Sequence, residues 1–150
     1  MLGISRWSPQ LFYTKRHKDD QREILTYIYG INGFYEEASS ARTSPKSLSY
    51  WSESDFLAER CLASETEDTL KRGITAMEQL LDYAEMAETS RLIIRLNIAK
   101  MATAINDLEK ARENIALARK GNHKVVEKRI QFDNRLQKLT TPLDQTAQEK

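Results

Sequence analysis

Apolar side chains recur at alternating steps of four and three residues in two runs of this 150-residue chain, at 70–84 and at 94–108. That spacing places the side chains of each run on one face of an α-helix, as in the seam of a coiled coil. No segment shows the sustained alternation of apolar and polar residues that a half-buried strand requires. We therefore expect an all-α fold. The seam residues are Leu70, Ile74, Met77, Leu81 and Ala84 in the first run, and Ile94, Ile98, Met101, Ile105 and Leu108 in the second.

A first helix and a linker are expected before these runs. Asp20 and Glu23 are spaced as a capping box, and an apolar face follows at residues 24, 28, 31 and 35. Residues 39–52 are rich in serine, contain one proline and have no acidic residue, which is typical of a linker. The first helix is therefore expected to be separated from the rest of the chain.

The later helices are expected to form an antiparallel helical hairpin or three-helix bundle with coiled-coil-like seams, giving four to five helices in all. A second helix, capped by Ser52 or Ser54, leads into the first seam. The pattern leaves open whether residues 66–120 form one helix or two. Gly121 provides a left-handed stop, and a last helix is expected over 124–139.

These signals divide the chain into four segments. Residues 1–18 are a basic, aromatic N-terminal arm, and residues 19–52 hold the first helix and the serine-rich linker. Residues 53–139 are the helical core, and residues 140–150 are a polar C-terminal tail. A chain of this length can bury roughly 68–70% of its unfolded surface, which is enough for one core.

Charge is unevenly distributed, although the formal net charge is only +1. Residues 53–88 carry ten acidic and three basic residues, whereas residues 89–138 carry twelve basic and five acidic residues. Opposite charge on neighbouring segments favours pairing between them. Exposed ion pairs contribute only about 0–1 kcal/mol each, so we expect the apolar seams to provide most of the stability.

The residue types needed for catalysis and metal binding are scarce. The chain has one cysteine, Cys61, and two histidines, His17 and His123, which are far apart in the sequence. No C-x-x-C pair, no Glu-x-x-His pair and no phosphate-binding glycine loop is present. Cys61 stands among apolar residues of an expected helix, so burial is favoured over reactivity. We expect no catalytic residue, no metal site and no cofactor, and therefore not an enzyme.

Residues 98–118 combine small and large apolar residues around a polar turn. Ile98 and Ala99 precede the turn Asn106–Leu108, and a small-large-small series follows at Ala111, Ile115 and Ala118. This arrangement resembles one unit of the tetratricopeptide repeat family, in which a turn at this position joins two helices. Shifts of 34 residues recover little of the pattern, so the sequence does not predict a repeat protein.

An all-α chain of this kind is expected to act as an adaptor or assembly subunit. Its amphipathic helices would bind partner proteins, in a homo- or hetero-oligomer. Aromatic residues are enriched at interface hot spots, so the aromatic residues of the arm and of the linker end are the candidate anchors. These candidates are Trp7, Phe12, Tyr50 and Trp51.

The alternative is a nucleic-acid-associated helical protein that uses the basic segment 89–138. Basic side chains recur along the last expected helix, where they could neutralise phosphates. The candidate residues are Lys124, Lys128, Arg129, Arg135 and Lys138.

The single cysteine favours a reducing, cytoplasmic location, and no run of about 20 apolar residues suggests a transmembrane segment. The arm at 1–18 has no acidic residue, which leaves import into an organelle as the alternative.

Overall fold

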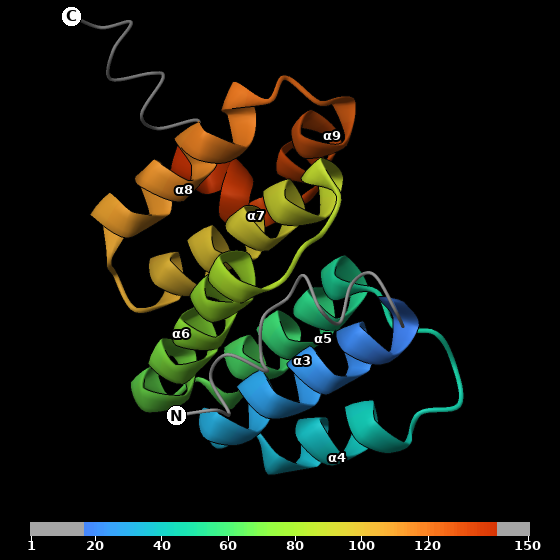
Figure 1. Ribbon diagram of the computed structural model, residues 1–150. Coiled ribbons are helices and arrows are strands. Elements are labelled where there is room, and N and C mark those ends of the chain that lie inside the picture. Colours follow the sequence, from blue (N-terminus) through green and yellow to red (C-terminus); the bar gives the residue numbers. More distant parts are fainter. Residues whose placement is uncertain (1–16, 141–150) are drawn as a thin grey trace, which may run out of the picture.

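The computed structural model describes residues 17–140. Within this range the chain folds into helices joined by short turns and has no strand, which confirms the all-α class (Figure 1). The helices are α3 (His17–Ile31), α4 (Tyr35–Thr43), α5 (Tyr50–Ser64), α6 (Glu67–Tyr83), α7 (Glu88–Ala104), α8 (Leu108–Lys120) and α9 (Lys124–Phe132), with a last helical segment at 134–140. The expected count of four to five helices is not confirmed, because several expected helices are divided by turns.

Helix α7 lies at the centre of the described structure and packs against α5, α6, α8 and α9 (Figure 1). It is buried over most of its circumference, and its buried residues include the polar pair Asn97 and Lys100. Helices α3 and α4 form a hairpin that packs against α6. Within it, Arg22 of α3 donates a hydrogen bond of 2.8 Å to the backbone oxygen of Ala41.

The first apolar seam is buried along its whole length, as its spacing predicts. The second seam is buried only as far as Met101, because α7 ends at Ala104. Asn106 has a left-handed φ of 64°, and the side chain of Asp107 then caps α8 by accepting from the backbone N–H of Lys110 at 3.2 Å. Residues 66–120 therefore hold three helices, α6, α7 and α8, rather than one or two.

The first helix begins earlier than expected, and its buried face includes only part of the expected one. It starts at His17 rather than Asp20, and it ends at Ile31, before a turn in which Gly33 has a φ of 86°. Ile24 and Ile28 are buried as expected, and Leu25 and Tyr29 complete the buried stripe of α3. Ile31 and Tyr35 are exposed, and the turn places Tyr35 in α4 rather than in the first helix.

The serine-rich stretch is only partly a linker. Helix α4 occupies its first part and packs on the neighbouring helices through the small residues Ala38 and Ala41. Helix α5 begins at Tyr50, and its cap is Ser49 rather than Ser52 or Ser54, because the Ser49 hydroxyl accepts from the backbone N–H of Ser52 at 3.3 Å.

The last expected helix is divided at Asp133. The Asp133 carboxylate accepts from the backbone N–H groups of Arg135 (2.9 Å) and Leu136 (3.2 Å), and so caps a new helical segment. Phe132 ends α9 with 79% of its surface exposed. The left-handed residue after α8 is Asn122, with a φ of 54°, whereas Gly121 has ordinary right-handed backbone angles.

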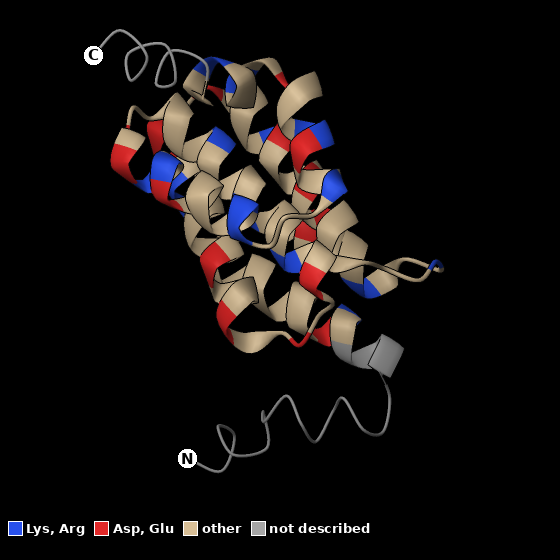
Figure 2. Cartoon of the chain, turned by 90° about the horizontal axis from the view of Figure 1, so that it is seen from above, with Lys and Arg blue, Asp and Glu red and all other residues tan. Residues whose placement is uncertain are grey.

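Ion pairs connect the acidic segment 53–88 with the basic segment 89–138. Lys110 of α8 lies 2.6 Å from Glu78 of α6, and two further pairs join α5 to Lys100 and to Arg129. Acidic and basic residues are interleaved over the helices in the view of Figure 2, rather than separated into two faces. No helix in the described part of the chain is long and apolar enough to cross a membrane.

Candidate protein-binding surface

Helix α5 contributes side chains to both the polar network and the groove described below. Its buried residues follow the helical repeat and turn one side of α5 into the core. These residues are Tyr50, Ser54, Leu57, Ala58, Cys61 and Leu62. At 100° per residue, Asp55 and Glu59 project from one flank of this stripe, and Glu53, Phe56 and Arg60 project from the other.

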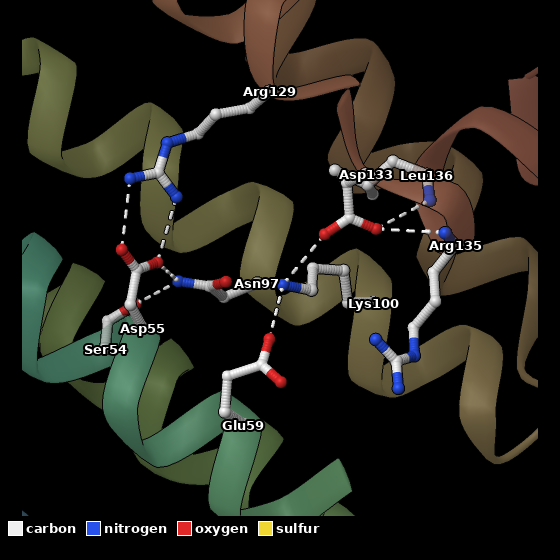
Figure 3. A network of polar contacts seen from close by, with 9 residues as sticks. All are labelled: Ser54, Asp55, Glu59, Asn97, Lys100, Arg129, Asp133, Arg135 and Leu136. Carbon is white, nitrogen blue, oxygen red and sulfur yellow. Dashed lines mark hydrogen bonds and ion pairs between the residues drawn. The ribbon is translucent and has the colours of Figure 1, made fainter. Parts of the chain in front are cut away.

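The first flank of α5 enters a network of polar contacts with α7 and α9 (Figure 3). Asp55 binds the guanidinium of Arg129 through two hydrogen bonds, each 3.0 Å long. The amide of Asn97, which is only 1% exposed, donates to Asp55 at 2.9 Å and also to the hydroxyl of Ser54. Buried polar groups are tolerated when they are paired in this way.

Lys100 of α7 is the second centre of the network. Its side chain is only 10% exposed, and its Nζ lies 3.0 Å from both Glu59 and Asp133 (Figure 3). Burial opposes ionisation of the Asp133 carboxyl, but the contact with Lys100 and the backbone N–H groups of Leu136 and Arg135 lower its pKa below the ordinary value. The network thus joins α5, α7 and the helical segment at 134–140. Its charged groups form ion pairs with one another.

Two buried reactive groups lie near α5. Burial, with a contribution from Glu37, raises the pKa of the Cys61 thiol to about 11, so the nucleophilic thiolate is scarce at neutral pH. Burial raises the pKa of Tyr29 well above its ordinary value, and the charges of Glu53 and Glu37 raise it further. The buried Tyr29 hydroxyl has no hydrogen-bond partner within the described structure. Burial therefore favours the neutral form of both groups.

The other flank of α5 lines an open groove against α4, with a volume of about 540 Å³. Phe56 lies in this groove with 66% of its surface exposed. Glu36 and Glu37 line the α4 wall, where Arg60 of α5 contacts them at 3.0 and 2.7 Å. Glu53 is half-buried, and this burial raises its pKa. We name this site, lined by Glu36, Glu37, Ser39, Ser40, Glu53, Phe56 and Arg60, the α4–α5 groove.

The sequence did not reveal this groove, because Phe56 stands among the apolar residues of the second helix and was not singled out as a surface residue. The sequence did contain a signal that Phe56 is exposed, namely its position on the helix relative to the buried residues of α5. Phe56 lies about 100° from the adjacent Leu57, on the side away from Ala58 and Leu62.

The expected aromatic anchors differ in their exposure in the structure. Trp7 and Phe12 lie outside the described residues. Tyr50 is 3% exposed and belongs to the core, whereas its neighbour Trp51 is 41% exposed. The Arg129 guanidinium lies 5.7 Å from the centroid of the Trp51 ring, which is within range of a cation–π contact.

The basic residues of the alternative hypothesis are only partly available. Arg129 is engaged by Asp55. The other four candidates are exposed, although Glu127 and Asp133 stand between them along the chain. These four residues are Lys124, Lys128, Arg135 and Lys138.

No group of three His, Cys, Asp or Glu side chains within residues 17–140 is arranged to hold a metal ion. His123, the histidine whose side chain is described, precedes α9 without capping it. No protein-family model, curated protein or solved structure matches the chain.

Proposed function

We propose that this chain is a non-enzymatic adaptor or assembly subunit that binds a partner protein in the α4–α5 groove. The exposed Phe56 in an otherwise polar, acidic groove is the observation that carries the proposal. Large apolar side chains at the surface of a protein favour binding when they lie in a concave site with polar residues around them.

The charges of the groove indicate the chemistry of the partner. Glu36, Glu37 and Glu53 outnumber Arg60, so the groove favours a segment with Lys or Arg on either side of an apolar side chain. Arg60 contacts Glu36 and Glu37 and offsets part of their charge, so the groove keeps a net negative charge from its three glutamates. The apolar side chain of the partner would pack on Phe56.

Nucleic-acid binding is the alternative proposal, and the exposed lysines Lys124, Lys128 and Lys138 support it. The engagement of Arg129 with Asp55 reduces the charge available for phosphates. Phosphate contacts would make binding fall steeply with salt concentration, and nuclease treatment would remove the partner.

Site-specific photocrosslinking of the full chain tests the proposal. Ser40, in the α4–α5 groove, is replaced by a photoreactive residue, and the full chain is added to an extract of the source cells and irradiated. The peptide that becomes attached to the chain is then sequenced. We expect one peptide with Lys or Arg beside an apolar residue, whose yield survives nuclease and is lost in Phe56→Ser.

Phe132→Ser is the matched control, because Phe132 is an equally bulky and even more exposed side chain outside the groove. It should leave the cross-link intact. A cross-link that Phe56→Ser does not reduce, or that nuclease abolishes, contradicts binding of a protein in this groove. A cross-link to the chain itself identifies a second copy as the occupant instead of a different protein.

A further inference from the structure

A second groove lies between the start of α5 and the connection from α6 to α7, and has a volume of about 470 Å³. Its apolar surface comes from Trp51 and Met86, with Tyr50 at its side. Gln21 of α3 and Glu85 contribute polar groups to the lining. We name this site the Trp51 groove; it is distinct from the α4–α5 groove, with which it shares no lining residue.

Residues 1–16 of the same chain join the described structure beside the Trp51 groove. They lead directly into α3, which begins at His17, and Gln21 in the groove wall is only about 6 Å further along that helix. Extended chain spans about 3.3 Å per residue, so Phe12 can reach a point up to roughly 17 Å from His17. The Trp51 groove is therefore within reach of this segment without any rearrangement of the helices.

The chemistry of residues 1–16 complements that of the groove. The segment carries Arg6, Lys15 and Arg16 and no acidic residue, and it holds three aromatic residues. The end of α6 and the connection to α7 are acidic, with Asp82, Glu85 and Glu88 all exposed. An aromatic ring gains favourable contacts with both indole and methionine side chains.

We propose that residues 1–16 dock in the Trp51 groove of their own chain, with Phe12 against Trp51 and Met86 and with Lys15 and Arg16 facing Glu85. Trp51 then acts as the receptor for an internal segment rather than as an anchor for a partner. The inference goes beyond the proposed function and does not depend on it, since the α4–α5 groove remains open when the Trp51 groove is filled.

Tryptophan fluorescence of the full chain tests the docking. The chain has two tryptophans, so Trp7→Phe leaves Trp51 as the only emitter. In that background, Phe12→Ala should shift the Trp51 emission to longer wavelength and increase its quenching by acrylamide about twofold, because the ring loses its cover. Ser8→Ala, a truncation in the same segment without an aromatic ring, should change neither quantity. Identical emission and quenching with and without the Phe12 ring would overturn the proposal.

Disulfide trapping distinguishes the possible occupants of the groove. In the Tyr13→Cys/Ala87→Cys variant, which keeps Phe12, Trp51 and Met86, mild oxidation should link the two new cysteines within one chain, and the buried Cys61 with its raised pKa should not compete. The control variant, Tyr13→Cys/Ser40→Cys, places the second cysteine in the α4–α5 groove and should link at least tenfold more slowly. Faster linkage in this control, or disulfide-linked dimers in place of linked monomers, would contradict docking of the segment in its own Trp51 groove.

Discussion

The two flanks of α5 use similar side chains for different purposes. The flank of α5 that faces α7 and α9, here the inner flank, carries Asp55 and Glu59. Asp55 pairs with Arg129, and Glu59 pairs with Lys100, so both carboxylates have a partner on another helix. On the outer flank, Glu53 and Phe56 line an open groove whose opposite wall is α4. Buried charged residues beside the core fix how helices pack. Arg60 on the outer flank also pairs with Glu36 and Glu37 of α4, but these groups are more exposed than Lys100, and the exposed Phe56 beside them is available for recognition.

The comparison predicts that substitutions on the inner flank reduce stability. Asp55→Ala removes two hydrogen bonds to Arg129 and one to the buried Asn97, so the free energy of unfolding should fall by about 2 kcal/mol. Chemical denaturation measures it. Asp68→Ala, which removes an exposed pair with Arg72 within α6, should cost much less. Equal losses in the two variants would show that the network does not fix the packing of α5.

Asp133 should make stability depend on pH. Its pKa is lowered in the folded chain, so its contribution is complete above the unfolded pKa of about 3.9 and is lost as the pH falls through the lower folded value. Asp133→Asn should therefore cost about 1–2 kcal/mol at pH 7, because Glu59 still contacts Lys100. The difference in free energy of unfolding between Asp133→Asn and the unsubstituted chain should decrease towards pH 2. A difference that stays constant over this range would contradict an ionised, paired Asp133.

Substitution of Tyr29 is expected to raise the free energy of unfolding rather than lower it. Its buried hydroxyl has no hydrogen-bond partner in the described structure, so Tyr29→Phe removes a desolvated polar group while keeping the ring. Thermal unfolding should show a gain of about 1 kcal/mol. Tyr83→Phe, at an exposed tyrosine, should have no measurable effect. A loss of stability in Tyr29→Phe would show that its hydroxyl is satisfied.

The smallest effect on stability is expected on the outer flank. Phe56→Ser changes a side chain that is mostly in contact with solvent, so the free energy of unfolding should change by no more than about 0.5 kcal/mol. A loss comparable to that of Asp55→Ala would place Phe56 in the structural part of the molecule and remove the distinction between the two flanks.

The helical class and much of the core could be predicted from the sequence because they depend on local periodicity. Leu70 and Ile74 repeat at helical spacing and are buried, and Cys61 is buried as its apolar surroundings suggest. The turn at Asn106–Leu108 was not expected, because the apolar spacing of the second seam continues through Ile105 and Leu108, although the repeat that residues 98–118 resemble has a turn at this position.

Features that depend on tertiary contacts could not be predicted. Helix α4 has a serine-rich sequence, and its packing through Ala38 and Ala41 is visible only once α3 and α5 are in place. The division at Asp133 likewise reflects the cap and the contact with Lys100, which is 33 residues away in the sequence. The α4–α5 groove arises between two helices that the sequence did not place together, so its residues could not be selected in advance.

The affinity of the cross-linked partner peptide for the full chain tests the central claim most directly. Titration of that peptide against the unsubstituted chain, Phe56→Ser and Phe132→Ser measures how much binding each exposed ring contributes. We predict at least a tenfold loss of affinity in Phe56→Ser and none in Phe132→Ser, with both variants as stable as the unsubstituted chain. Equal affinity in all three chains would contradict recognition through the α4–α5 groove.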